Sequence, residues 1–290
     1  MLTDSIGYRQ SSVNADLSAA NGKPSIAQYI RKILLVSDND AFNRLYEFLG
    51  QEYINNTLHN MGYDSVQIIH RLDISRTEEE NRQTNPVRFV DEKGNLIYSK
   101  PAVKSELVYS RRDTRMGKGF MRGDELVNEP FDFSKKNRFP LQDLNAIVKS
   151  VIFPGSMPKK QRFNLTADDL SFLRKYMSMF PSESDFPHYD TSEIHDTYVK
   201  FLYYGAEKIT PDKNIRIFNK PGDAYGFMID AAYIADHKNN VEFLLSAIIH
   251  CNSDGIFNDD KYDYETIGKP FMKNLGRTIY EYELTRKKKR

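Results

Sequence analysis

Two short groups of residues, far apart in the sequence, have side chains suited to acyl-transfer chemistry. The first is Ser37-Asp38-Asn39, where one predicted helix ends and the next begins. The second is Lys220-Pro221-Gly222-Asp223, on a predicted strand. A hydroxyl can relay a proton, an ammonium attracts an anion, and backbone N–H groups beside a glycine can stabilise a developing oxyanion. Residues of these types could take part in acyl transfer if folding brought the two groups together.

The order of the two groups resembles that of class A β-lactamases and penicillin-binding serine acyl-enzymes, in which Ser-Asp-Asn precedes Lys-x-Gly. The resemblance covers nearly the whole chain from about Pro24 to Tyr282. Residues 86–135 have no counterpart and are predicted to be an insertion. The family's Ser-x-x-Lys signature, which carries the nucleophile, does not occur before Ser37. The resemblance therefore implies an N-terminally truncated chain that lacks the attacking serine and its lysine.

The resemblance implies a role for each residue of the first group. Ser37 would relay a proton to the leaving nitrogen, and Asn39 would face the amide of the substrate. Asp38 would point away and hold the turn by accepting hydrogen bonds from backbone N–H groups. The alternative is that the triplet is only a helix N-cap cluster, because Ser, Asp and Asn are all N-cap residue types.

The family resemblance also implies roles for the residues of the second group, 220–223. Lys220 would lie near Ser37 and near a carboxylate of the substrate, and Gly222 would let the substrate approach the backbone. The N–H group of Asp223 would form half of the oxyanion hole. A strand edge with one exposed lysine is the alternative. Pro221 departs from the family pattern, because it replaces a hydroxyl residue and has no backbone N–H.

The deacylating base has no clear equivalent in this sequence. Glu79 or Glu80 stands in about the right region, but the spacing does not match the family pattern, and a solvated acidic loop is the competing interpretation. Without a placed base, acylation could occur while deacylation stays slow, as in a penicillin-binding protein. A literal Ser-x-x-Lys at 156–159 comes after Ser-Asp-Asn, and Pro158 interrupts its helical turn, so we interpret it as coincidence.

Composition narrows the classes of partner. The 290 residues carry 41 basic and 40 acidic side chains, and this balance gives no general electrostatic attraction to nucleic acid. The basic run 286–290 is predicted to be a solvated tail. Cys251 is the only cysteine, which excludes an internal disulfide, and the histidine spacing fits no zinc signature. We expect a small-molecule substrate, a β-lactam or a peptidoglycan-like amide, with no metal, no cofactor and a monomeric chain.

Targeting signals are missing from the printed sequence. No apolar run approaches the ~20 residues that cross a bilayer, and the polar N-terminal residues do not form a signal peptide. The family implies a periplasmic or secreted protein. One loss from the N-terminal end would account for the missing signal and the missing nucleophile together.

The periodicity of apolar residues predicts an α/β fold, with an antiparallel sheet flanked by helices beside an all-α lobe. We predict a single β-lactamase-like domain over 1–290, with a mainly helical lobe at 24–205 and the sheet and closing helix at 206–284. Helices are predicted from Pro24, over 38–50, 52–60, 141–152 and 194–204, after Thr166, and from Thr266 to about Glu283.

Strands are predicted at 66–69, in a hairpin at 87–98, and at 215–218, 227–234 and 241–249 in antiparallel order. Residues 78–81 are predicted to be a charged loop and 111–125 a mobile, glycine-rich excursion. The resulting functional prediction is a serine β-lactamase-like hydrolase that is inactive as this chain stands. The alternatives are a cell-wall D,D-peptidase or esterase with the same machinery, and a non-catalytic binding module.

Overall fold

A computed structural model of the chain describes residues 1–7, 10–109 and 112–286. The chain divides into two compact units. Unit 1 contains residues 1–110, 135–139 and 182–189, and unit 2 contains residues 111–134, 140–181 and 190–290. Residues 287–290, most of the predicted basic tail, lie outside the described part. Each unit is described by itself below.

Unit 1 begins with β1 (Leu2–Thr3) and three helices, α1 (Ile26–Val36), α2 (Asn39–Leu49) and α3 (Gln51–Asn60). The Ser25 hydroxyl accepts a hydrogen bond from the Gln28 N–H and caps α1. Gly50, which has a positive φ of 78°, separates α2 from α3. The apolar faces of α1 and α2 pack with Val87 and Phe89 of the hairpin that follows, in a core that includes Tyr29.

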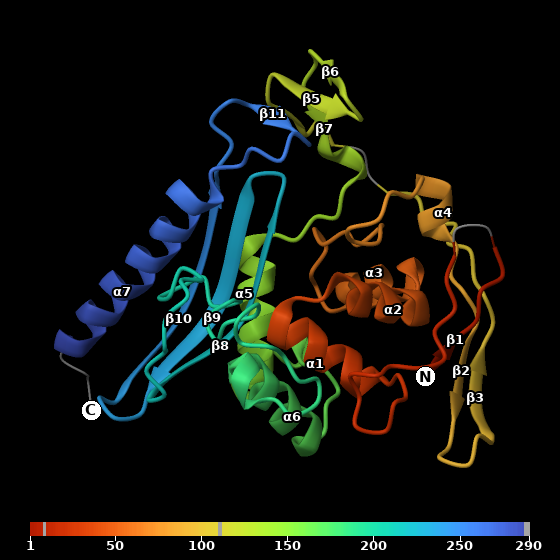
Figure 1. Cartoon of the computed structure of the whole chain (residues 1–290), viewed down its shortest axis with the longest axis horizontal. Helices are drawn as coiled ribbons and strands as arrows, with labels where there is room; N and C mark the ends of the chain where they lie inside the picture. Colours follow the sequence, from red (N-terminus) through yellow and green to blue (C-terminus); the bar gives the residue numbers. More distant parts are fainter. Residues whose placement is uncertain (8–9, 110–111, 287–290) are drawn as a thin grey trace. The chain divides into compact units, whose positions relative to one another are not determined.

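The hairpin predicted at 87–98 is confirmed. Strands β2 (Val87–Val90) and β3 (Leu96–Lys100) pair antiparallel, and β1 joins the other side of β2 in the order β1-β2-β3. β3 is therefore the edge of this sheet (Figure 1). Gly94, with a positive φ of 87°, lies in the turn between the strands.

Unit 2 is built on a sheet of three ten-residue strands, β8 (Ile215–Ala224), β9 (Phe227–Asp236) and β10 (Val241–His250). Their order is β10-β9-β8 and all pairs are antiparallel, as the sequence predicts. A two-residue turn at Tyr225 and Gly226, both with positive φ, joins β8 to β9. Positive φ at both positions matches the right-handed twist of a hairpin.

Helices cover both faces of this sheet (Figure 1). Helix α7 (Lys269–Thr285) follows a π-helical turn at Tyr264–Gly268 and packs on β10. Helix α5 (Leu141–Ile152) packs on β9 and β10, and helix α6 (Ala167–Ser178) packs on β8. The buried core on the α7 side includes Ile217, Ile234 and Met272. This confirms the predicted fold class, a mixed α/β protein with an antiparallel sheet flanked by helices.

Short elements complete unit 2 and the segments around it. Strand β5 (Gly119–Arg122) lies between β6 (Glu125–Val127) and β11 (Ile256–Phe257), and β4 (Arg115–Met116) pairs with β7 (Phe131–Asp132). Four 3-10 turns occur among the described residues, at Phe133–Lys135, Pro154–Ser156, Lys159–Gln161 and Pro181–Glu183. The predicted excursion at 111–125 thus contains paired strands, because Gly117 and Gly123 supply the positive φ that its turns require.

The predicted strand at 66–69 is wrong. Only Gln67 forms a β-bridge there, with Arg138. The Asn55 side chain binds both the N–H and the C=O of Ile68, and the Asn137 side chain accepts from the Ile69 N–H. Side chains therefore take the backbone groups that a neighbouring strand would have used.

Two further local predictions are wrong. Residues 78–81 belong to a short helix, α4 (Glu78–Arg82), which starts with a capping box between Thr77 and Glu80. The helix predicted at 194–204 is a series of turns instead. The core side chain of Asp230 binds the Leu202 N–H there, and Tyr203 has a φ of 78°, which no helix can contain. None of the described helices is long and apolar enough to span a membrane.

Candidate functional site

The turn between α1 and α2 carries the Ser-Asp-Asn group. Ser37 ends α1, and its N–H donates to the Ile33 carbonyl at 3.1 Å. Asp38 is the N-cap of α2, and its carboxylate accepts from the Ala41 N–H at 2.7 Å. This is the backbone hydrogen bond that the sequence predicts for Asp38. Asn39 is the first residue of α2 and continues from the cap.

Ser37 has a left-handed backbone conformation, with φ 58° and ψ 41°. A residue with a Cβ costs about 1 kcal/mol or more in this region, so the position would be more stable with glycine. Helix ends commonly use glycine for this reason. Seven other non-glycine residues among those described also have a positive φ, so the conformation identifies Ser37 as the C-cap of α1 and does not by itself assign a function to its hydroxyl.

Lys220 lies on β8 opposite Ala231 of β9. The side chain is half-buried, and its ammonium donates to the Pro221 carbonyl at 2.6 Å. Burial lowers the pKa of Lys220 to about 8, although the carboxylates of Asp230 and Asp223 act in the opposite direction. With this pKa the side chain is still mainly an ammonium at neutral pH, which suits anion binding.

The residues after Lys220 continue the same strand. Pro221 pairs with Asp230 and Gly222 with Ile229. β8 is the edge strand of the sheet, where proline is tolerated because the ladder need not use its missing N–H. A Cβ on Gly222 would meet only the Ile229 side chain, at 3.7 Å. The packing of the protein therefore does not require glycine here, and the open space is available to a ligand.

A buried polar network on β8 and β9 was missed by the sequence analysis. The fully buried ammonium of Lys200 donates to the carbonyls of Met177 and Ile217, at 2.7 and 2.9 Å, and to the Asn219 side chain at 2.9 Å. Asn219 donates to the carboxylate of Asp230 at 3.0 Å. Burial raises the pKa of Asp230 to about 6, while its hydrogen bonds and the two lysines limit the rise. The network fixes β8 directly before Lys220.

The signal for this network was present in the sequence. Asp230 interrupts the apolar run 227–234, and Lys200 stands between Val199 and Phe201. A charged residue inside an apolar run needs a partner when it is buried. The pattern could have indicated a buried polar cluster, although it could not have shown which residues meet.

Glu79 and Glu80, the candidates for a deacylating base, both lie on α4. The Glu79 carboxylate accepts a hydrogen bond from Lys104, and this interaction lowers the pKa of Glu79. The Glu80 carboxylate accepts from the Thr77 N–H at 2.7 Å and completes the capping box. Both carboxylates have structural partners, which favours the alternative interpretation over a catalytic base.

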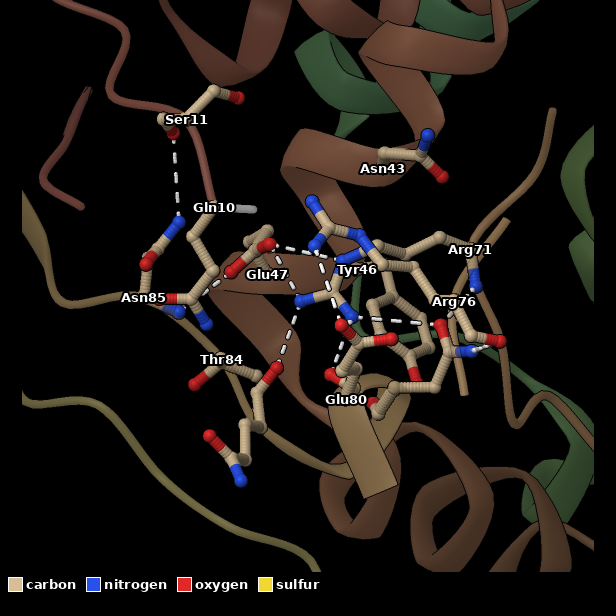
Figure 2. A network of polar contacts seen from close by, with 12 residues as sticks. Gln10, Ser11, Asn43, Tyr46, Glu47, Arg71, Arg76, Glu80, Thr84 and Asn85 are labelled. Carbon is tan, nitrogen blue, oxygen red and sulfur yellow. Dashed lines mark hydrogen bonds and ion pairs between the residues drawn. The ribbon is translucent and has the colours of Figure 1, made fainter. Parts of the chain in front are cut away.

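A buried ion pair holds the segment 69–85 against α2 (Figure 2). The Arg71 guanidinium donates to the Glu47 carboxylate from Nε and Nη2, at 2.9 and 2.6 Å, and both side chains are less than one tenth exposed. Arg71 also donates to the Gln83 carbonyl at 2.7 Å, and Glu47 accepts from the Asn85 N–H at 2.6 Å. The network makes α2, which begins at the Ser-Asp-Asn turn, a fixed element of unit 1.

The predicted site residues fall into two groups. Ser37 and Asn39 are neighbours in unit 1, whereas Lys220, Gly222 and Asp223 are neighbours in unit 2. The joint site that the family resemblance implies therefore stays a prediction. Ser156, the serine of the Ser-x-x-Lys sequence interpreted as coincidence, ends a 3-10 turn, and its hydroxyl donates to the Phe153 carbonyl. No cluster of three or more His, Cys, Asp or Glu side chains suited to a metal ion occurs among the described residues.

Comparisons with known proteins bear on the first of these groups. Residues 2–101 match the model of the "Beta-lactamase enzyme family". The matched segment contains the α1–α2 turn, and over these residues the match confirms the predicted resemblance to the β-lactamase and penicillin-binding type of fold family. Residues 86–101, predicted to belong to an insertion without a counterpart, lie inside the match, and the Lys220 group lies outside it. No curated protein is similar enough to count as a match.

One similar solved structure is a β-lactamase from Sphaerobacter thermophilus DSM 20745. The similarity covers 88% of this chain and 64% of that one, with 9% sequence identity and a TM-score of 0.39. The present chain thus spans less than two thirds of the length of that β-lactamase. A likeness at this level supports no argument about activity.

Proposed function

We propose that the chain is a β-lactamase-like domain, inactive as the 290 residues stand, whose ligand is a β-lactam or a similar cyclic or peptide amide. The observation that carries the proposal is the Ser37-Asp38-Asn39 turn between α1 and α2, which lies in the segment matched by the family model. In this proposal the Ser37 hydroxyl and the Asn39 side chain hydrogen-bond the amide of the ligand. Lys220 attracts the ligand carboxylate.

In unit 2, strand β8 carries a second group of proposed ligand-binding residues. Gly222 leaves space at the strand edge, and the N–H of Asp223 donates to the carbonyl oxygen of the ligand. Because Pro221 supplies no hydroxyl, the ligand carboxylate depends on Lys220 more than in the usual Lys-[Ser/Thr]-Gly pattern. With no Ser-x-x-Lys before Ser37 in the sequence, the 290 residues bind the ligand without forming an acyl-enzyme.

The first experiment measures binding and covalent attachment separately. Calorimetry with benzylpenicillin is expected to show saturable binding, while mass spectrometry after incubation shows no added mass and a chromogenic cephalosporin is not turned over. Lys220→Met is expected to weaken binding about tenfold, because a charge-assisted contact contributes about 1.5 kcal/mol or more. The control Lys213→Met removes an exposed positive charge just before β8 and leaves binding unchanged.

A second variant tests the strained turn. Ser37→Gly relieves the left-handed strain and is expected to stabilise the chain by about 1 kcal/mol while weakening penicillin binding. Equal binding by the original chain and by both variants would overturn the proposed site. Covalent mass gain that Ser156→Ala abolishes would overturn the interpretation of Ser156 as a coincidence and the expectation that the chain does not acylate.

A further inference from the structure

Unit 1 contains a cavity that none of the proposed catalytic residues lines. Its volume is about 550 Å³, within the range of about 300–1,000 Å³ that is typical of small-molecule sites. The wall is formed by the end of α2, the start of α3, Arg82 at the end of α4, the end of β3 and the segment that follows β3. Phe48, Tyr53, Tyr98 and Val103 give it a largely apolar surface.

Lys100, the last residue of β3, brings a positive charge to the cavity wall. Its ammonium donates to the carbonyls of Phe48 and Leu49 at the C-terminal end of α2, with a distance of 2.9 Å to Leu49. An ammonium has three donors, so one remains after these contacts. No carboxylate among the described residues lies within 4.0 Å of the Lys100 Nζ atom. Partial burial lowers the pKa of Lys100, as expected for a cation that lacks an anionic partner.

The other basic side chains of the wall are already engaged. Arg82 donates to the carbonyls of Ser105 and Leu107, at 3.0 and 2.8 Å, and forms an ion pair with Glu78 at 3.7 Å. Lys104 pairs with Glu79 at 2.7 Å. Among the three basic side chains of the wall, Lys100 is thus the one without a carboxylate partner in the described part of the chain, and an anionic ligand can neutralise its charge.

The acidic side chain of the wall has a partner as well. Glu52, in the first turn of α3, accepts a hydrogen bond from the Glu106 N–H at 2.7 Å, which anchors its carboxylate to the backbone of the segment after β3. Around the cavity the apolar side chains are incompletely covered, with Tyr53 61% and Tyr98 52% exposed. A ligand in the cavity would remove part of these two rings from water, and such burial is favourable.

We propose that this cavity binds a small organic anion with one carboxylate and an aromatic or branched apolar body. The carboxylate accepts a charge-assisted hydrogen bond from the free donor of Lys100, and the apolar body lies against Tyr53, Tyr98 and Val103. The site is separate from the proposed β-lactam site, because it shares no residue with Ser37, Asn39 or β8.

Calorimetry with 3-phenylpropanoate tests the proposal on the full chain, and 3-phenylpropanamide serves as the uncharged analogue of the same shape. Saturable binding of the acid is expected, with the amide at least tenfold weaker, a factor that corresponds to about 1.4 kcal/mol. Lys100→Met is expected to abolish the preference for the acid. Lys93→Met, which removes an exposed charge in the turn before β3, is the matched control and leaves both affinities unchanged.

Lys100 also caps α2, so the Lys100→Met variant is first checked for folding by far-ultraviolet circular dichroism. If it does not fold, the acid–amide comparison on the unaltered chain and the variant Tyr53→Ala decide. Tyr53 is exposed, and its truncation is expected to weaken binding of the acid several-fold without unfolding α3. Absence of saturable binding, or equal affinity for acid and amide, overturns the proposal. Neither result depends on whether benzylpenicillin binds.

Discussion

Replacement of Arg71 by methionine tests how unit 1 is held together. Arg71→Met keeps most of the apolar stem but removes a guanidinium that contacts Glu47, the Gln83 carbonyl and the Glu80 carbonyl, the last at 3.1 Å. Glu47, with 6% of its side chain exposed, then remains as a buried carboxylate without its cation. Loss of one partner from a buried ion pair costs about 3–5 kcal/mol, most of it from the charge left behind.

The free energy of unfolding in urea, followed by circular dichroism, measures this cost. With a slope of about 3 kcal/mol per molar urea, the midpoint is expected to fall by 1 M or more. The matched control is Arg88→Met, whose ion pair with Asp4 is also short, at 2.8 Å against 2.6 Å for Arg71 and Glu47, but has side chains 45% and 35% exposed. Exposed pairs contribute less than about 1 kcal/mol because water and salt screen them.

The double variant Glu47→Gln/Arg71→Met separates the pair from its surroundings. Glutamine can still accept from the Asn85 N–H, and it leaves no buried charge. The double variant is therefore expected to be more stable than Arg71→Met alone. If Arg71→Met costs no more than Arg88→Met, the ion pair does not anchor the segment 69–85, and the reasoning is refuted.

Two further predictions concern unit 2. Gly276→Ala is expected to lower the thermal unfolding temperature, because the added Cβ would lie 2.3 Å from the backbone nitrogen of Tyr203. This clash outweighs the helix propensity of alanine, which favours the substitution by about 1 kcal/mol. Gly155→Ala, whose Cβ would have no atom within 4 Å, is the control. Burial raises the pKa of Asp230 from 3.8 to about 6, so the folded chain binds a proton on this carboxyl group more tightly than the unfolded chain does. Proton binding therefore contributes to the stability of the folded chain below pH 4, and this contribution is lost as the pH rises through 6. The unfolding free energy relative to Asp230→Asn should therefore fall between pH 4 and pH 6, and a constant difference would contradict the raised pKa.

The sequence predicted the helices and strands in which a regular pattern of apolar residues continues over many positions and is bounded by capping or turn residues. The three strands of unit 2 were found because alternating or continuous apolar runs are separated by turn residues, and α2 because Asp38 caps it and Gly50 ends it. The Asp38 hydrogen bond was also predictable, since a short carboxylate at an N-cap has few other partners. The residues 194–204 were mispredicted, because apolar residues at helical spacing do not show that Asp230 binds their backbone.

The sequence by itself determined the family resemblance, the identity of Ser37, Asn39 and Lys220 as candidate site residues, and the antiparallel order of the last three strands. Those features depend on residue types and short spacings, which are local. The tertiary structure decided the buried Lys200–Asn219–Asp230 network, the backbone turns at 194–204 and the cavity beside Lys100. Each of these depends on which backbone groups and charges meet after folding, and contacts between distant residues have no local pattern from which to be predicted.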